Sequence, residues 1–191
     1  MYKKVVCVGR NYVEHIEELN NEFPTEPVYF IKPNSCISDE IKVVDYSPMH
    51  YEGEICFLIE NKRAVAVGFG FDMTLREIQT KLKKKGLPWE RAKAFKNSAV
   101  FSEFVEFNGF DGLEVEVIKN GKFVQKGGVE LMIYKPEFLI EDIDKIFGLE
   151  DGDIVMSGTP KGVGVVEKGD KFIGRILQKG RVLVEREFIA Y

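Results

Sequence analysis

Runs of apolar residues separated by turn-forming residues predict a chain built mainly of short strands. Residues 5–8 are all apolar and are followed by Gly9, which is typical of a buried strand. The same pattern predicts strands at residues 28–31, 41–44 and 154–156. Paired runs that flank turn residues predict hairpins at 54–60 with 64–69, 115–118 with 123–125, and 172–176 with 182–189. The turn Asn120-Gly121 in the second pair favours a type I′ turn, which needs positive φ at both central positions.

Helical spacing occurs in three places. Asn11, with Glu14 three residues later, is a candidate capping box for a short helix that reaches Leu19. A second helix follows Asp72, with Thr74 as its candidate N-cap, and ends near Gly86. The third covers residues 138–147, where the apolar positions form one face. The sum is an α+β fold, predominantly β, in a single domain over residues 1–191.

Composition narrows the class of protein. The 191 residues are 45% hydrophobic and 30% charged, which is ordinary for a globular chain. A net charge of −4 lacks the basic footprint of a nucleic-acid-binding protein. No apolar run approaches a membrane span or a signal peptide, so we expect a cytoplasmic protein without a membrane partner. The three cysteines form no CxxC pair and are expected to be free, buried residues.

Three acidic residues are candidate ligands of a divalent metal. Glu52 and Glu54 lie two residues apart, so on a strand both carboxylates point to the same face, and Gly53 between them leaves room for a close approach. Asp72 stands at the end of the next predicted strand. An all-oxygen set suits Mg²⁺, Mn²⁺ or Ca²⁺ better than zinc. The spacing alone also fits a solvated strand edge that carries acidic residues.

Two further features are candidates for catalysis. His15 and Glu18 are spaced i, i+3, so the carboxylate can orient the imidazole as a general base and favour its charged form. Lys93 lies among aromatic residues and could stabilise an oxyanion. Both patterns also occur on ordinary protein surfaces. The glycine-rich loop at 157–164 could hold an anion through its backbone N–H groups, or be an ordinary turn. The lysines near Gly86 fit a solvated helix end.

Taken together, these motifs resemble the fumarylacetoacetate hydrolase family over nearly the whole chain. The order and spacing of the motifs carry the resemblance, more than any one of them. They are Gly9-Arg10-Asn11-Tyr12 with His15, Phe30-Ile31-Lys32-Pro33, Tyr51-Glu52-Gly53-Glu54, Gly70-Phe71-Asp72-Met73-Thr74, Ala92-Lys93-Ala94-Phe95 and Ser157-Gly158-Thr159-Pro160-Lys161-Gly162-Val163-Gly164.

The resemblance implies a fold of layered mixed β-sheets, with a short lid helix and two further helices, in a homodimer. It also implies a Mg²⁺ or Mn²⁺ site at Glu52, Glu54 and Asp72. The lid would carry the catalytic pair His15 and Glu18, completed by Lys93. We expect the substrate site to be lined by Arg10, Arg76, Gln79 and Thr159.

The expected substrate is a small 2-oxo acid or dicarbonyl compound. The preferred reactions are hydrolysis of the C–C bond of an acylpyruvate and decarboxylation of oxaloacetate, both through an enolate that the metal stabilises. The alternatives are an isomerase or decarboxylase of aromatic meta-cleavage products, an oxaloacetate keto–enol tautomerase, and a non-catalytic binding protein. The stretch after Phe95 departs from the family pattern, and its extra lysine, Lys96, could alter substrate preference.

Overall fold

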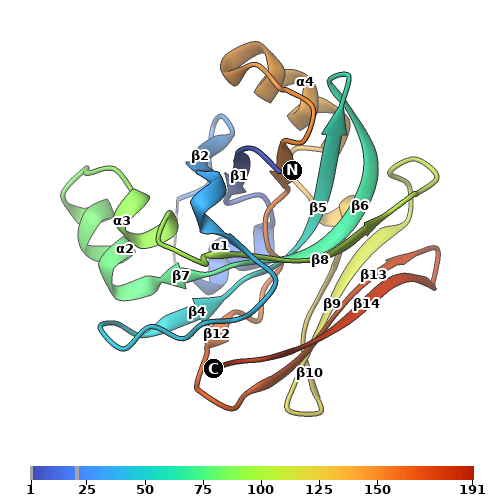
Figure 1. The fold of residues 1–191 in the computed structure, drawn as a ribbon. Coiled ribbons are helices and arrows are strands. Elements are labelled where there is room, and N and C mark those ends of the chain that lie inside the picture. The colour runs from blue at the N-terminus through green and yellow to red at the C-terminus, as the bar shows by residue number, and fades with distance from the viewer. Residues whose placement is uncertain (1, 20–21) are drawn as a thin grey trace.

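Fourteen strands and four α-helices make up the part of the chain that the computed structural model describes, residues 2–19 and 22–191 (Figure 1). The strands form three sheets. The largest has the order β2 (Val28–Lys32), β1 (Val5–Gly9), β11 (Ile154–Met156), β5 (Gly53–Glu60), β6 (Arg63–Asp72), β8 (Ala99–Val105), β3 (Ile37–Ser38). The second has the order β10 (Lys122–Gly128), β9 (Leu113–Lys119), β13 (Lys171–Gln178), β14 (Arg181–Ile189). The third has the order β12 (Gly164–Val165), β4 (Met49–Tyr51), β7 (Thr74–Leu75).

The largest sheet is mixed. The pairs β1–β11 and β3–β8 are parallel, and the other neighbours in this sheet are antiparallel. Figure 1 shows β9, β13 and β14 as a separate layer beside β5, β6 and β8. The prediction of a mostly β chain with layered mixed sheets is therefore confirmed.

Aromatic side chains hold the two larger sheets together. Phe69 and Phe71 of β6 meet Phe172 of β13 and Phe188 of β14, and all four rings are buried. The ring centroids of Phe71 lie 5.3 Å from those of Phe172 and 5.5 Å from those of Phe188. Such pairs add about 0.5–1.5 kcal/mol each beyond the burial of their area. The three cysteines are free and buried, as predicted.

Gly53 is required by this packing. A Cβ atom built on Gly53 would lie 2.4 Å from Cγ2 of Val117 on β9, which is closer than real Cβ contacts. The sequence predicted that Gly53 leaves room for a backbone or a ligand. The structure instead gives this room to a side chain of the second sheet, and Glu52 and Glu54 on either side of Gly53 are thereby fixed in place.

The three predicted hairpins are confirmed, and their turns explain why. Asn120 and Gly121 both have positive φ, 50° and 79°, as a type I′ turn requires. Lys179 and Gly180 repeat these values between β13 and β14. Asn61 and Lys62 turn the chain between β5 and β6 with φ of 47° and 61°.

The predicted helices are present as α1 (Val13–Glu18), α2 (Arg76–Lys84) and α4 (Pro136–Phe147). The last begins two residues before its predicted start because Pro136 occupies the first helical turn, where a missing N–H costs nothing. A fourth helix, α3 (Glu90–Lys93), and strand β8 were not predicted. The expected lid helix and two further helices are thus present, and α3 is an additional short helix.

Both predicted caps were wrong, because the two side chains have other partners. The N-cap of α1 is Tyr12, and Asn11 Nδ2 instead donates to the carbonyls of Ser157 at 2.8 Å and Tyr134 at 3.0 Å. The N-cap of α2 is Leu75, and Thr74 Oγ1 donates to the carbonyl of Asp72 at 3.2 Å. Asn11 thus ties the start of α1 to the glycine-rich loop.

The predicted strand at 41–44 was also wrong. Ile41 makes only an isolated bridge to Ala190, and the amide of Val43 donates to the carbonyl of Tyr191 at 2.9 Å. This segment is held by the end of the chain and does not pair along its length with a neighbouring strand. The nearby strand is β3, which pairs in parallel with β8.

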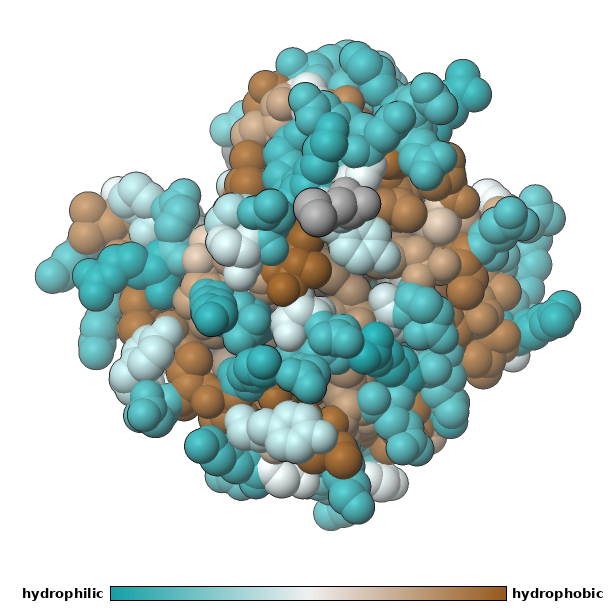
Figure 2. All heavy atoms as spheres, viewed as in Figure 1, coloured by the Kyte–Doolittle hydropathy of each residue, from teal (hydrophilic) through white to brown (hydrophobic). Residues whose placement is uncertain are grey.

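The surface is mostly polar in the view of Figure 2, where hydrophilic side chains cover most of the face and apolar ones show between them. Of the helices that the structure describes, none has both the length and the apolar character needed to cross a membrane.

Candidate active site

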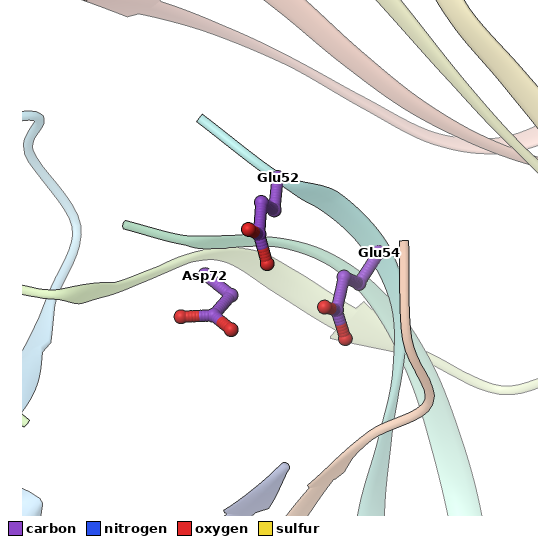
Figure 3. Close-up of side chains that lie close together, drawn as sticks. All are labelled: Glu52, Glu54 and Asp72. Atoms are coloured by element: carbon purple, nitrogen blue, oxygen red, sulfur yellow. The ribbon is translucent and has the colours of Figure 1, made fainter. Parts of the chain in front are cut away.

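The three predicted metal ligands converge at one end of β5 and β6. Glu52 lies directly before β5, Glu54 is on β5, and Asp72 is the last residue of β6. The amide of Asp72 donates to the carbonyl of Glu52 at 2.9 Å, which places the two residues side by side. One carboxylate oxygen from each acid lies within 4.8 Å of the others, and all three side chains are buried. Figure 3 shows the three carboxylates pointing into the same space.

Lys93 on α3 binds two of these acids. Its Nζ lies 2.8 Å from Oε2 of Glu52, 2.6 Å from Oδ2 of Asp72 and 2.7 Å from Oγ1 of Thr74. An ammonium group has three N–H donors, so these three acceptors use all of them. Burial alone would lower the pKa of Lys93, but the carboxylates of Asp72 and Glu52 raise it above its ordinary value. Lys93 therefore remains charged and orders the acids.

Lys32 is a second cation at the acids, and no role was predicted for it from the sequence. It is fully buried at the end of β2, and its Nζ lies 2.9 Å from Oδ1 of Asp72. Its Nζ also donates to the carbonyls of Lys93 and Met73, and to the carbonyl and Oγ of Ser98, both at 3.0 Å. The sequence feature that could have indicated its burial is its position directly after the apolar run at 28–31 and before Pro33.

Arg76 on α2 is a third cation at the acids, and it contacts both Glu52 and Gln79. Its Nη2 donates to Oε1 of Glu52 in a close ion pair, and its Nη1 donates to Oε1 of Gln79 at 2.8 Å. Burial alone would raise the pKa of Glu52, but Lys93 and Arg76 hold it well below its ordinary range. This bond uses Oε1 of Gln79 and does not involve its amide NH₂ group.

The carboxylates fit a hard divalent cation. Lys32 pairs with Oδ1 of Asp72 by charge, yet among residues 2–19 and 22–191 no hydrogen bond of acceptable angle reaches this buried oxygen. Burial, with the charges of Asp72 and Glu52, raises the pKa of Glu54 well above its ordinary value. Glu54 accepts a hydrogen bond from the amide of Gly158 at 2.8 Å. A cation ligated by carboxylate oxygens would satisfy the open oxygen and relieve the repulsion.

The predicted lid pair lies over the same pocket. His15 Nδ1 lies 3.1 Å from Oε2 of Glu18, and the amide of Gly162 donates to the other oxygen of Glu18 at 3.0 Å. The glycine-rich loop thus holds the lid carboxylate and Glu54 through two backbone amides. Burial lowers the pKa of His15 below its ordinary value, although Glu52 and the bond to Glu18 act in the opposite direction. Glu18 thus favours the charged form of His15 as predicted, but burial outweighs its effect and the pKa remains lowered.

One pocket contains most of the predicted site residues. It encloses about 400 Å³, part of it open to solvent, and is lined by His15, Glu52, Glu54, Arg10, Arg76, Gln79, Lys93 and Thr159. Asp72 is not part of this lining, but its Oδ2 lies 2.6 Å from Nζ of Lys93, which is. Thr159 Oγ1 donates to the carbonyl of Gly53 and accepts from Gln125, both at 2.9 Å, so its hydroxyl is used within the protein.

Lys83 also lines this pocket, which the sequence analysis did not foresee. The prediction for the lysines near Gly86 was a solvated helix end. Lys83 is half-buried on the same face of α2 as Arg76 and Gln79, whereas its neighbour Lys84 is exposed. Lys96, the departure noted after Phe95, is not part of the lining.

Comparisons with known proteins agree with this geometry. A family model described as fumarylacetoacetate (FAA) hydrolase C-terminal matches residues 4–186. The chain is 40% identical over 187 residues to an oxaloacetate tautomerase, YcgM, of Escherichia coli (strain K12), covering 88% of this chain and 85% of that protein. It is 38% identical over 188 residues to the mitochondrial oxaloacetate tautomerase FAHD1 of Bos taurus, with the same two shares covered.

Solved structures show the same fold. A putative fumarylacetoacetate isomerase/hydrolase from Oleispira antarctica superposes with a TM-score of 0.95 at 35% identity, covering 100% of this chain and 94% of that one. A fumarylpyruvate hydrolase from Pseudomonas aeruginosa, in complex with Mn²⁺ and pyruvate, superposes with a TM-score of 0.89 at 27% identity, covering 99% and 89%.

Proposed function

The chain belongs to the fumarylacetoacetate hydrolase family, and from this premise we propose that it is a divalent-metal-dependent enzyme that acts on 2-oxo acids. The observation that carries the proposal is the group of three buried carboxylates, with oxygens within 4.8 Å of one another, in a pocket shared with His15. The Mn²⁺ and pyruvate in the related fumarylpyruvate hydrolase support both the metal and the substrate class. Mg²⁺ and Mn²⁺ both suit an all-oxygen donor set.

Glu52, Glu54 and Asp72 would hold the cation. When bound, it would act as a Lewis acid and stabilise negative charge on the oxygen of a 2-oxo group. The protein's own groups then orient the substrate. We assign a contact with a substrate oxygen to the amide NH₂ of Gln79, because Arg76 holds Oε1 at 2.8 Å and this bond does not involve the NH₂ group. Lys93 donates its three N–H groups to Glu52, Asp72 and Thr74, so we assign it to ordering the acids. We assign the hydrogen bond to the oxyanion to Gln79.

His15 would move the proton. Its lowered pKa keeps the imidazole neutral and able to accept, while Glu18 fixes the ring through Nδ1. In hydrolysis of an acylpyruvate, His15 would take a proton from the water that attacks the distal carbonyl. In keto–enol exchange, His15 would take the proton from one position of the substrate and return it to another. Decarboxylation of oxaloacetate needs no attacking water and depends least on His15.

Two candidate reaction classes have support, and the support comes from different relatives. Hydrolysis and decarboxylation were preferred from the sequence, and the fumarylpyruvate hydrolase supports hydrolysis. Keto–enol exchange is the second candidate, since relatives at 40% and 38% identity are named oxaloacetate tautomerases. It needs only the single mobile proton that His15 provides. We further propose a homodimer in the cytoplasm, acting on a small molecule.

A turnover panel tests the proposal. Oxaloacetate, acetylpyruvate and a 2-hydroxyhepta-2,4-diene-1,7-dioate are offered with Mg²⁺ or Mn²⁺, and both enol–keto exchange and loss of substrate are recorded. We expect turnover of at least one substrate and its loss with EDTA. Activity that survives thorough chelation would contradict the metal assignment. Inactivity on all three substrates with both metals would contradict the substrate class.

A further inference from the structure

The pocket has an apolar wall to which the proposed chemistry assigns no role. Phe30 of β2, Trp89 of the turn between α2 and α3, and Leu19 at the end of α1 line this wall. All three side chains are half-buried. In ligand pockets a few polar groups fix the orientation of the ligand, and the apolar walls surround the rest of it. This wall is therefore the part of the pocket that can select substrates by shape.

Phe30 and Trp89 lead away from the acids in that order. The Nζ of Lys93, which binds Glu52 and Asp72, lies 5.0 Å from the centroid of the Phe30 ring. The ring centroids of Phe30 and Trp89 lie 5.9 Å apart. A ligand that is held at the carboxylates and extends along this wall therefore meets Phe30 first and Trp89 next.

Trp89 is held in place by its backbone and by its ring. Its carbonyl accepts from the amide of Lys93 at 3.0 Å, so the turn that places the ring also places the lysine that orders the acids. A Cβ built on Gly9 would lie 3.6 Å from Cζ3 of Trp89, which shows that the ring packs against the end of β1. The ammonium of Lys83 lies 5.8 Å from the ring centroid and adds a cation–π contact. The indole is thus a fixed part of the wall.

The space in front of this wall is small. The pocket encloses about 400 Å³, part of it open to solvent, whereas pockets for small molecules range over about 300–1,000 Å³. In a closely fitting pocket, one methylene group too many or too few changes kcat/KM by about 10–200-fold. A fixed indole at this place would therefore discriminate strongly between short and long chains.

We propose that Trp89, supported by Phe30, is a specificity-determining residue that sets the length of the substrate. The preferred substrate is then a 2-oxo acid with a short chain beyond the 2-oxo group, and long acyl chains meet the indole. This inference rests on the proposed function, because the 2-oxo acid group must bind at the carboxylates for its chain to extend along the wall. Trp89 acts by shape and has no part in the chemistry.

Kinetics with acetylpyruvate and hexanoylpyruvate in Mg²⁺ test the inference. Wild type should prefer acetylpyruvate by at least about tenfold in kcat/KM, whichever reaction is recorded. Trp89→Leu should raise the ratio of kcat/KM for hexanoylpyruvate to that for acetylpyruvate by about tenfold, mainly through a lower KM for hexanoylpyruvate. Trp89→Phe keeps a smaller ring and should raise the ratio by less. Leu87→Ala, at an exposed leucine of the same turn that does not line the pocket, is the matched control and should leave the ratio unchanged.

The ratio separates selection by shape from a structural role, because a structural defect would lower turnover of both substrates equally. A wild type without preference, or a ratio in Trp89→Leu equal to that of wild type, overturns the role of Trp89 and leaves the proposed function standing. A wild type that turns over neither substrate with Mg²⁺ or Mn²⁺ overturns both. If Trp89→Leu fails to fold, Trp89→Phe against Leu87→Ala still decides.

Fluorescence gives a second readout, because Trp89 is the only tryptophan of the chain. The ligand is 2-oxopentanoate, which has the carbon skeleton of acetylpyruvate without its 4-oxo group. Titrated into the protein with Mg²⁺, it should change the tryptophan emission, and the shorter pyruvate should change the emission less. Unchanged emission at concentrations of 2-oxopentanoate that inhibit turnover would place the chain of the ligand away from Trp89 and overturn the inference.

Discussion

At the scale of single residues, the site is a balance of buried charges. Glu52 is matched by Lys93 and Arg76, and Asp72 by Lys93 and Lys32. Within the described residues, Glu54 accepts only the amide N–H of Gly158, and its pKa is raised. A buried ion that loses its partner costs more than an exposed one, since water cannot replace the lost contact. The cations are therefore as much a part of the site as the acids.

Lys32→Met tests this balance through stability. Removing a fully buried ammonium leaves Asp72 with less compensation and removes the donor from four hydrogen-bond acceptors. We expect a loss of about 3–5 kcal/mol in the free energy of unfolding. Urea denaturation of the metal-free protein measures it. The control is Lys62→Met, which removes an exposed ion pair with Asp144 and should cost less than about 1 kcal/mol. Equal losses in the two variants would mean that Lys32 is not energetically linked to the site.

The pH dependence of turnover tests His15 as the base. A base must be neutral, so kcat/KM should fall as the pH falls through the pKa of His15. Because burial lowers this pKa, the acidic limb should lie below the ordinary value of about 6.5. Glu18→Gln removes a bond that raises the pKa and should move the limb to still lower pH.

His15→Ala should reduce hydrolysis or keto–enol exchange by about 10²–10⁴-fold, and decarboxylation by less. His50→Asn is the control, because this second histidine does not line the pocket. An acidic limb that survives in His15→Ala would assign the titration to another group.

Single residues also show where sequence reasoning stops. The acids and the lid pair were predictable because their spacing on a strand or a helix places them together locally. Lys32 and Lys83 were not, since a lysine after an apolar run and a lysine in a basic helix end both have ordinary surface explanations. Only the packing of β2 and α2 around the acids turns these two side chains inward.

At the scale of elements, those defined by local sequence signals were predicted, and those that depend on long-range contacts were not. The hairpins were predicted because Asn120-Gly121 and Lys179-Gly180 define turns within a few residues. Helix α3 has only four residues, too few to show a helical period, and β8 owes its pairing to β6 and β3. The two predicted N-caps were wrong because Asn11 bonds to the distant Ser157, and Thr74 bonds to Lys93 in the site.

Gly53→Ala tests the contact between the two large sheets. The added Cβ would meet Cγ2 of Val117 at 2.4 Å, and forcing a methyl group into a packed layer costs about 1–3 kcal/mol. Thermal unfolding of Gly53→Ala, Val117→Ala and the double variant forms a mutant cycle. We expect the double variant to be more stable than the sum of the single effects predicts. Strict additivity would show that the two positions do not clash.

At the scale of the whole molecule, the site joins segments that lie far apart in the sequence. His15, the proposed base, comes from α1, the acids from the region of β5 and β6, and Lys93 from α3. The amides of Gly158 and Gly162 come from the loop after β11. The strand order β1-β11-β5-β6 brings these segments to one end of the sheet. This order was not deducible from hydrophobic pattern alone, because the parallel pairing of β1 with β11 links residues 5 and 154.

Since the acids come from adjacent strands at the centre of this sheet, metal binding should stabilise the entire fold. A cation that binds only the folded state at about 100 times its Kd adds about 2.7 kcal/mol, which for a chain of this length raises Tm by about 5–10 °C. Calorimetric scans with Mg²⁺ or Mn²⁺, and with EDTA, measure the shift. Glu54→Gln should abolish the metal-dependent shift, yet melt no lower than wild type in EDTA, because it removes a repelled buried charge. A metal-dependent shift that persists in Glu54→Gln would place the cation elsewhere.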